Sequence, residues 1–540
     1  MIFDRSFDFA RMLSAVDLVA LVLFGAILLF GEFQTKWGWL RLRKSKTLSP
    51  PSSPTPTSHS HKPEPEPRRK GVQDIPGPWP RLPVLGTRWI YSLGVYKMDK
   101  IHEAYRDMFE RYGPVVREEA LWRIPVVSVL ERSAIETVLR SSTKYPLRPP
   151  TEVTSHYRRS RPDRYTNLGL VNEQGETWHH LRSILTPELT SGKTMLRFLP
   201  ELNTVASDMS TLLATSRDAK GVIPKFEELA NRLGLESTCT LILGRRMGFL
   251  DDKVDPQAAK LAAAVKVHFC ASRDTFYGLP FWKVMPTKAY RELVESEETI
   301  YDIISGLVDT ALAEEQNTAQ IDAVQSVFLA VLNAPGLDIR DKKAAIIDFI
   351  AAGIQTLGNT LVFVLYLIAK HPNVQQRLYE ELITAAPPGS PWTAQNLRNA
   401  PYLRACIMEA FRVLPTAPCV ARIIDTDMVL SGYHLNAGSV VLCHTWLAGL
   451  KESNFPAAHE YRPERWLNGG PGSAATFLVL PFGCGRRMCP GKRFVEQALQ
   501  VVVAQTVRDF EVGFDGELGL QFEFLLSPQG TASFSFLDRV

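Results

Sequence analysis

The sequence predicts a mainly α-helical protein with small β-sheets. From a proline-rich segment near residue 75 to about residue 415, apolar residues recur mostly at helical spacing. Two later segments, 417–445 and 510–536, instead alternate apolar and polar residues and carry glycine and asparagine turn signals, as strands do. No repeat of fixed period is visible, which excludes solenoids and propellers.

The composition indicates one large folded region in a reducing compartment. Of the 540 residues, 45% are hydrophobic, which is enough to form a large core. The 61 Lys and Arg nearly balance the 57 Asp and Glu, so no overall positive field favours nucleic acid. The seven cysteines are an odd number scattered over a long chain, unlike the dense pattern of a disulfide-stapled secreted domain.

The N-terminal segment, residues 1–46, is predicted to be a hydrophobic targeting or anchor segment. Residues 18–30 form an apolar run that approaches the roughly 20 residues of a membrane span only if its flanks are included. Basic residues follow the run, and the positive-inside rule would keep the remainder of the protein cytosolic. A mitochondrial presequence is instead poor in acids, whereas this segment contains Asp4, Asp8 and Asp17.

A linker and a folded region are expected to follow. Residues 47–74 are rich in proline, serine and threonine without an apolar period, as in an extended linker. Clustered prolines in residues 75–87 fix φ repeatedly, so a stiff segment is expected to begin a single folded region at 75–540.

The longest predicted helix runs from Asp338 to Lys370 and ends before a proline. Gly353 and Gly358 lie in its interior, where each glycine costs about 1 kcal/mol relative to alanine. Close helix packing explains a single such glycine. Because two of them flank Gln355 and Thr356, we favour a local opening of the backbone ladder where a ligand approaches.

Two cysteines in the segment PFGCGRRMCPG suggest different roles. Zinc binding is disfavoured because no second Cys/His pair lies at metal-ligand spacing, and Cys484 is interpreted as a buried structural thiol. Cys489 precedes Pro490, which is expected at the first position of a helix, where the partial positive charge favours a thiolate. A thiolate on a glycine-rich loop suits an axial ligand of haem iron.

This segment resembles the haem-binding signature of the cytochrome P450 superfamily, F-x-x-G-x-R-x-C-x-G. The matching residues are Phe482, Gly485, Arg487, Cys489 and Gly491. The resemblance implies a haem (iron protoporphyrin IX) held between a long central helix and the Cys-bearing loop. It also implies a monooxygenase that uses dioxygen and NADPH-derived electrons.

Further motifs resemble the same family in the same order. Glu409 and Arg412 match its E-x-x-R motif, and Arg465 resembles the third member of that structural ion triad. Trp178 and Arg182 match W-x-x-x-R, and together with Arg422 and Arg487 they are expected to hold the haem propionates.

The resemblance also implies catalytic roles on the central helix. Thr356 stands where the family has its oxygen-activating threonine, beside Gly353. The family usually has an acid before this threonine, but Gln355 cannot relay a proton by titrating, so we expect it to position a water.

Basic residues near the haem loop resemble the face with which mitochondrial members of the family meet an acidic ferredoxin. These are Arg404, Lys492 and Arg493, although Met408 replaces a further basic position of that pattern. A ferredoxin and its reductase are the expected partners, with a microsomal flavoprotein reductase as the alternative. Mitochondria are the expected location, and the endoplasmic reticulum, or both, is the alternative.

Several long stretches resemble a steroid-hormone hydroxylase of the mitochondrial type. They include residues 145–152, 160–175 and 340–354. Another steroid or sterol hydroxylase of this group remains an alternative, as does a haem protein that binds steroid without turnover. Substrate contacts are expected in loops, which vary freely on one scaffold, within residues 145–175, 268–285 and 522–530.

Overall fold

The computed structural model describes residues 70–141, 143–253, 255–315, 326–470 and 472–539. All of these except Lys283–Met285 belong to one compact unit, which is the unit described below. The predicted N-terminal segment and most of the predicted linker, residues 1–69, lie outside the described residues.

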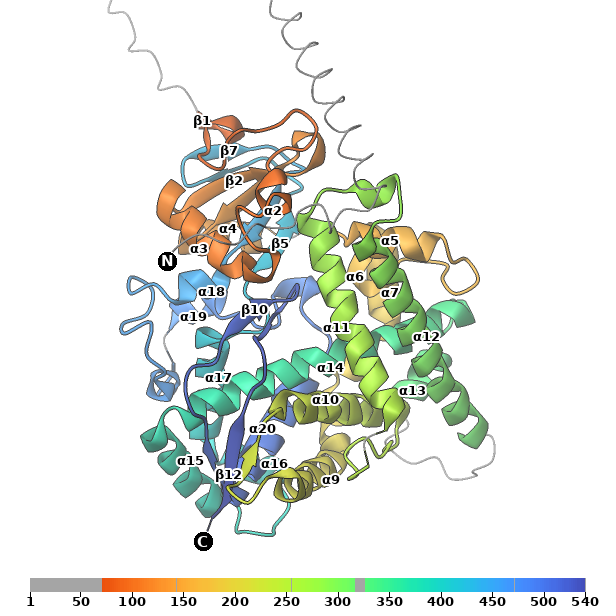
Figure 1. Ribbon diagram of the computed structural model, residues 1–540, viewed down its shortest axis with the longest axis vertical. Helices are drawn as coiled ribbons and strands as arrows, with labels where there is room; N and C mark the ends of the chain where they lie inside the picture. Colours follow the sequence, from red (N-terminus) through yellow and green to blue (C-terminus); the bar gives the residue numbers. More distant parts are fainter. Residues whose placement is uncertain (1–69, 142, 254, 316–325, 471, 540) are drawn as a thin grey trace, which may run out of the picture. The chain divides into compact units, whose positions relative to one another are not determined.

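Helices dominate the described chain, in agreement with the predicted mainly α fold (Figure 1). The segments Val72–Asp74 (η2), Pro463–Trp466 (η7) and Gly485–Arg487 (η8) are short 3-10 helices. The α-helices are α2 (Trp89–Ser92), α3 (Ile101–Tyr112), α4 (Arg132–Arg140), α5 (Glu152–Arg159), α6 (Gly169–Asn172), α7 (Gly175–Leu185), α8 (Pro187–Thr190), α9 (Gly192–Ser216), α10 (Phe226–Leu243), α11 (Pro256–Tyr277), α12 (Lys288–Glu315), α13 (Ser326–Leu332), α14 (Ile339–Ala369), α15 (Pro372–Ala385), α16 (Ala394–Arg398), α17 (Pro401–Val413), α18 (Thr445–Gly449), α19 (Ser473–Leu478) and α20 (Lys492–Asp509).

The predicted long helix is α14, which crosses the middle of the molecule in Figure 1. Its N-cap is Asp338, whose side chain accepts a hydrogen bond from the backbone N–H of Arg340. It ends at Ala369, and α15 begins at Pro372, so the proline stop is confirmed. Among the described helices, α14 alone is long and apolar enough to cross a membrane, but 78% of its most apolar window is buried inside the protein.

Close approach of α10 explains the two interior glycines of α14. A Cβ on Gly353 would overlap Thr238 of α10, and one on Gly358 would lie 2.6 Å from the side-chain oxygen of Asn231. The expected local opening of the backbone ladder is therefore wrong, because α14 is continuous and both positions are needed for helix packing.

Four small sheets complete the fold of the described residues. The largest has the order β2-β3-β8-β5, in which β3 and β8 are parallel and the other neighbours are antiparallel. The other sheets have the orders β1-β7-β6, β4-β12-β9 and β10-β11. The strands are β1 (Lys70–Gly71), β2 (Val115–Glu119), β3 (Pro125–Val129), β4 (Val222–Ile223), β5 (Val420–Ile423), β6 (Met428–Leu430), β7 (Tyr433–Leu435), β8 (Val440–Cys443), β9 (Phe510–Gly513), β10 (Leu520–Phe522), β11 (Leu526–Pro528) and β12 (Phe534–Asp538).

Strands β5–β8 and β9–β12 fall in the two segments where strand-like alternation was noted. Strands β2 and β3 were not predicted within the helical region. Each has only five residues, and β3 pairs with β8, more than 300 positions later in the chain. This long-range pairing stabilises β3 as a strand and is not visible in the local sequence.

The folded region begins earlier than the expected boundary at residue 75. Strand β1 pairs with β7 through Lys70 and Tyr433, and η2 follows directly. At least residues 70–74 of the predicted linker therefore belong to the folded region.

Candidate active site

The cysteine-bearing loop joins α19 to α20 and makes a compact turn around Cys489. Gly483 and Gly485 adopt φ values of 70° and 65°, which residues with a Cβ rarely tolerate. The backbone N–H of Cys489 donates to the carbonyl of Phe482 at 2.9 Å. The ring of Phe482 meets Phe411 edge to face with centroids 5.4 Å apart, which fixes the loop on α17.

The helix after this loop begins two residues later than predicted. Gly491 is the N-cap of α20 and Lys492 is its first residue, so Pro490 precedes the cap and does not occupy the first helical position. Pro490 has no backbone N–H, so no hydrogen-bond donor is left unpaired at this position of the loop.

The environment of the Cys489 thiol differs from the expectation of a depressed pKa. Burial raises its pKa above the ordinary value, although the backbone N–H groups of Gly491 and Lys492 and the charges of Arg182 and Arg148 act in the opposite direction. The donors that favour a thiolate are thus present, but burial outweighs them in the protein alone. A bound cation that deprotonates the thiol would change this balance.

Four arginines converge around the Cys489 loop. Burial lowers the pKa of Arg182 and Arg148, and the Cys489 thiolate opposes both shifts. Burial and the charges of Arg148, Arg422 and Arg182 together lower the pKa of Arg487 to about 9. Among the described residues, none of the four forms an ion pair with a carboxylate, so the cluster has the chemistry of an anion site.

The motifs of the sequence do not mark Arg148, the fourth arginine of this cluster. It lies in the quoted stretch YPLRPPTE, which was assigned only to the general substrate region. Its proximity to Arg422 and Cys489 arises from folding alone, through the bridge between Leu147 and Ile423.

Arg422 and Arg487 differ in how their donors are used. Arg422, on β5, donates to the carbonyls of Ala421 and Cys484, and its Nε has no hydrogen-bond partner among the described residues. Arg487 instead donates to four oxygens, which are the carbonyls of Pro146 (2.9 Å), Leu170 (3.4 Å) and Glu173 (2.8 Å) and the side-chain Oε1 of Gln174 (2.9 Å). In this arrangement Arg487 ties the cysteine loop to the segment before α7, and Arg422 retains a free donor.

Trp178 packs against the Arg487 guanidinium. Its side chain is buried, and the Arg487 guanidinium stacks over the indole ring at 3.8 Å from the centroid. Trp178 thus contacts the predicted propionate arginine directly. Arg182 lies on the same helix, α7, one turn further along.

Thr356 and Gln355 lie in the middle of α14. The Thr356 hydroxyl donates to the carbonyl of Ala352 at 2.6 Å, a hydrogen bond within the helix itself. The hydroxyl lies on an exposed part of the helix surface and retains lone pairs that can accept a hydrogen bond. Gln355 is buried, and Gly353 packs against Thr238 of α10, so close helix packing explains why a glycine stands at this position.

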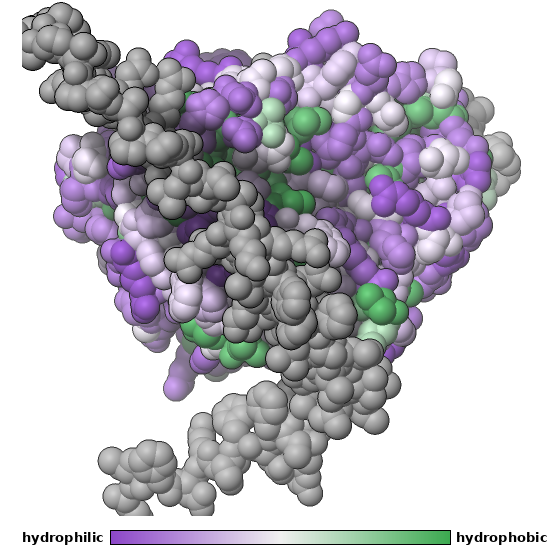
Figure 2. Space-filling model, turned by 90° about the horizontal axis from the view of Figure 1, so that it is seen from above, coloured by the Kyte–Doolittle hydropathy of each residue, from purple (hydrophilic) through white to green (hydrophobic). Residues whose placement is uncertain are grey.

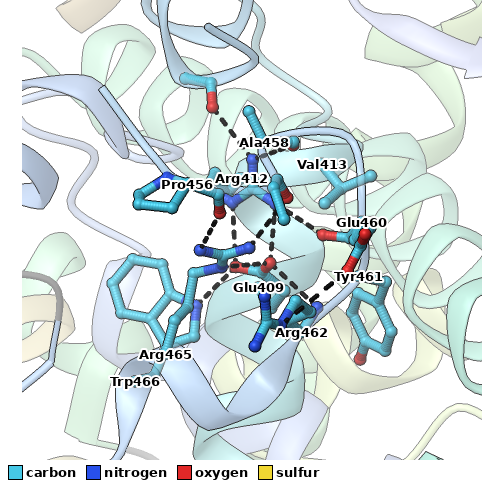
Figure 3. A network of polar contacts seen from close by, with 12 residues as sticks. Glu409, Arg412, Val413, Pro456, Ala458, Glu460, Tyr461, Arg462, Arg465 and Trp466 are labelled. Atoms are coloured by element: carbon cyan, nitrogen blue, oxygen red, sulfur yellow. Dashed lines mark hydrogen bonds and ion pairs between the residues drawn. The ribbon is translucent and has the colours of Figure 1, made fainter. Parts of the chain in front are cut away.

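The predicted ion triad forms as expected (Figure 3). Glu409 accepts from Arg412 Nε at 2.9 Å and Nη2 at 2.7 Å, and from Arg465 Nε at 2.8 Å. The backbone N–H of Arg462 and the indole N–H of Trp466 also donate to this carboxylate, at 3.1 and 2.7 Å. Both Glu409 and Arg412 are almost completely buried, so the triad fixes α17 to the segment around η7.

Arg412 extends the network in the other direction. It donates to the backbone carbonyls of Gly449, Ala458 and Glu460. Gly449 is the last residue of α18, and Ala458 and Glu460 lie outside helices and strands, so one buried guanidinium satisfies a carbonyl at a helix end and two carbonyls of irregular backbone.

The predicted partner-binding residues lie on two helices that pack together, α17 and α20. Arg404 and Arg493 are exposed, whereas Lys492 is half-buried and lies 3.8 Å from Glu496. Arg404 also donates to the carbonyls of Leu397 and Arg398, which orients its side chain. Two exposed cations on this face are available to a partner.

The residues present fit a haem. Cys489 offers a sulfur ligand next to Gly491, where a Cβ would lie 3.8 Å from that sulfur. The arginine cluster lacks carboxylate partners among the described residues, and the Arg422 Nε is an unpaired buried donor, as a site for the two propionate groups requires. In the described residues, no group of three or more His, Cys, Asp or Glu side chains could hold a metal ion.

Comparison with known families identifies the class of protein. Residues 76–534 match the Cytochrome P450 family, so the chain belongs to this family. It is a cytochrome P450 monooxygenase, and membership of the family implies a haem, a redox partner and a small-molecule substrate.

The chain is similar to several characterised relatives. It is 48% identical over 488 residues to ecdysone 20-monooxygenase of Drosophila melanogaster, a match that covers 88% of this chain and 90% of the relative. It is 30% identical over 470 residues to mitochondrial cytochrome P450 302a1 of the same species, covering 85% and 94%. It is also 27% identical over 446 residues to the mitochondrial 1,25-dihydroxyvitamin D(3) 24-hydroxylase of Rattus norvegicus, covering 82% and 84%.

Proposed function

We propose that this monooxygenase hydroxylates the steroid hormone ecdysone at C20 to give 20-hydroxyecdysone. The observation that carries the proposal is the 48% identity to ecdysone 20-monooxygenase over nearly the whole of both chains. This identity far exceeds that of the other relatives named above, which are 27–30% identical. The ecdysteroid is therefore the substrate that the comparisons favour.

The roles of the site residues follow from their positions. Cys489 is the residue proposed to offer its sulfur to the haem iron, and Arg148, Arg182 and Arg422 are the proposed partners of the propionates. When bound, the haem supplies the activation of dioxygen and the oxidation of a C–H bond. The protein contributes the exposed Cys489 thiol on its hydrogen-bonded loop and the surface of α14 around Thr356.

Proton delivery is proposed to use Thr356 and water. The Thr356 hydroxyl can accept a hydrogen bond from a water molecule on its free lone pairs while it donates to Ala352, and so it can hold that water in place. Gln355 is buried and cannot titrate, so its proposed role is to orient a water molecule.

Electrons are proposed to come from NADPH through a ferredoxin and its reductase in mitochondria. The exposed cations Arg404 and Arg493, with Lys492 beside them, support an acidic partner because opposite charge steers association. Two relatives named above carry "mitochondrial" in their names, which supports this location. A microsomal flavoprotein reductase and the endoplasmic reticulum are the alternative.

The test is to incubate the haem-loaded full chain with ecdysone and NADPH, in parallel with the ferredoxin chain and with the flavoprotein reductase. The proposal predicts 20-hydroxyecdysone with the ferredoxin chain. Product only with the flavoprotein would contradict the mitochondrial partner while leaving the reaction intact. No product with either chain would contradict the substrate assignment.

Two alternatives give distinct outcomes in the same experiment. Another steroid or sterol hydroxylase, for which the similarity to the vitamin D hydroxylase is the supporting observation, would oxidise a different steroid and leave ecdysone unchanged. A non-catalytic steroid-binding haem protein would bind ecdysone and shift the haem spectrum without forming product.

A further inference from the structure

A cavity of about 290 Å³ lies between the largest sheet and the helical part of the molecule. Apolar side chains from β3 and β8, among them Val126, Val440 and Leu442, form one wall. Pro149 and Ile423 also line the cavity, and each directly follows an arginine of the cluster beside Cys489, namely Arg148 and Arg422. The cavity therefore adjoins the proposed haem site.

The elements around this cavity include α2, β2 and the end of α11, which lie in the upper part of Figure 1. The view onto that side in Figure 2 shows apolar residues (green) beside a hollow. A mostly apolar cavity next to the reacting centre suits a steroid skeleton.

One part of the cavity lining is polar, and it is built from residues far apart in the sequence. Glu118 on β2 is only 6% exposed, and the buried tyrosines Tyr91, Tyr105 and Tyr277 surround it. The rings of Tyr91 and Tyr277 meet edge to face with centroids 5.3 Å apart. All four residues line the cavity.

The Glu118 carboxyl group is incompletely satisfied. Its Oε1 accepts from the Tyr91 hydroxyl at 2.7 Å. Its Oε2 is buried and has no hydrogen-bond partner of normal geometry among the described residues, although the Tyr105 hydroxyl lies nearby. A buried acceptor that has lost its hydration and gained no hydrogen bond is energetically unfavourable. Such an atom beside a cavity therefore indicates that a ligand supplies the missing donor.

Neighbouring charge restricts what that donor can be. Arg88 also lines the cavity, lies close enough for its charge to stabilise the Glu118 carboxylate, and stacks over Phe276 at 5.3 Å. Because this guanidinium already provides positive charge, a cationic ligand would be repelled. A neutral hydroxyl can donate to Oε2 without that repulsion, and the tyrosine hydroxyls can accept from or donate to a second hydroxyl.

We propose that Glu118, together with Tyr105 and Tyr277, is the specificity-determining polar anchor of this cavity and binds a ring hydroxyl of a hydroxylated steroid. This inference rests on the proposed function. With C20 at the reacting centre, the hydroxylated ring end of ecdysone is the part that extends away from the haem into the cavity. The apolar walls then contact the skeleton, and the anchor selects steroids that carry a hydroxyl at that end.

The test compares two ligands and three proteins by equilibrium dialysis of the haem-loaded full chain. The ligands are radiolabelled ecdysone and 2-deoxyecdysone, which lacks one ring hydroxyl at that end. The proteins are the unmodified chain, Glu118→Gln and, as a matched control, Glu517→Gln. Glu517 also accepts from a tyrosine hydroxyl, that of Tyr366 at 2.6 Å, but it does not line the cavity.

The unmodified chain and Glu517→Gln are expected to bind ecdysone more tightly than 2-deoxyecdysone. Glu118→Gln is expected to bind ecdysone about tenfold or more weakly, because a hydrogen bond to a buried carboxyl oxygen is lost, and to bind the two ligands nearly equally. Tyr277→Phe, a second variant, is expected to reduce the same preference if Glu118→Gln does not fold.

Two results would overturn the inference while leaving the proposed function standing. One is an unchanged ecdysone affinity in both variants, and the other is an equal weakening of both ligands. Failure of the unmodified chain to bind ecdysone at all would instead overturn the proposed function, and this inference with it.

Discussion

Replacing Glu409 by glutamine is expected to destabilise the protein strongly, because it removes the only negative charge of the ion triad. Glu409 receives five hydrogen bonds, three of them from the guanidinium groups of Arg412 and Arg465. The Arg412 and Arg465 side chains are 0% and 11% exposed, so they cannot recover hydration. Removing one partner of a buried ion pair costs about 3–5 kcal/mol.

That loss is large compared with the total stability of about 5–15 kcal/mol that proteins usually have. The unfolding entropy of a folded region of this size is about 1 kcal/mol per K, so the unfolding midpoint should fall by about 3–5 °C. The assay is urea and thermal unfolding followed by circular dichroism, with retention of haem measured on the same samples. Haem should be lost at lower urea, since the triad fixes α17, on which the cysteine loop packs through Phe411.

Glu464→Gln is the matched control. Glu464 lies one residue from Arg465 and accepts from Arg377 and Tyr402 at 2.8 and 2.7 Å, but its side chain is 46% exposed. Its loss should cost about 0–1 kcal/mol, as for other exposed pairs. Equal destabilisation by the two substitutions would refute the reasoning that burial of the triad sets its contribution.

Four further substitutions test other parts of the account. Cys489→Ala should abolish the carbon monoxide difference spectrum of a haem thiolate while circular dichroism stays unchanged; a retained spectrum would contradict the ligand assignment. Gly353→Ala should lower the free energy of unfolding, measured by the same urea titration, by about 1–3 kcal/mol because the new Cβ overlaps Thr238. Combining it with Thr238→Ala should restore part of that stability. An unchanged stability of Gly353→Ala would contradict the packing role. Burial lowers the pKa of His444 to about 3, so only the unfolded chain takes up a proton here as the pH falls below 6.5. The free energy of unfolding should therefore fall by about 1.4 kcal/mol per pH unit from pH 6.5 downward. His444→Gln should reduce this slope relative to the unmodified chain, and an unchanged slope would contradict the prediction. Arg493→Glu should raise the KM for ferredoxin and weaken its salt dependence with kcat little changed, whereas Arg159→Glu, an exposed control on α5, should do neither.

The sequence was most informative where function depends on residues close together in the chain. Cys489, Gly485 and Arg487 share one loop, and Glu409 and Arg412 lie one helical turn apart, so short motifs that resemble those of the family were enough to mark them. The bounds of α14 were also predictable, because an Asp cap and a proline mark its two ends.

The features that the sequence did not disclose arise between distant segments. Gly353 was assigned to the chemistry because nothing in its own helix shows that Thr238 packs against it. The donors that Arg487 directs to Pro146 and to Glu173 are equally invisible in the motif. The cavity anchor joins Glu118 to Tyr277, which only the packing of β2 and α11 brings together.

The most direct test of the central claim is to follow the oxygen atom itself. The haem-loaded chain is incubated with ecdysone, NADPH and the ferredoxin chain under isotopically labelled dioxygen, and the product is examined by mass spectrometry. The account predicts 20-hydroxyecdysone carrying one labelled oxygen. Ecdysone that binds and is recovered unlabelled, with electrons supplied, would contradict it.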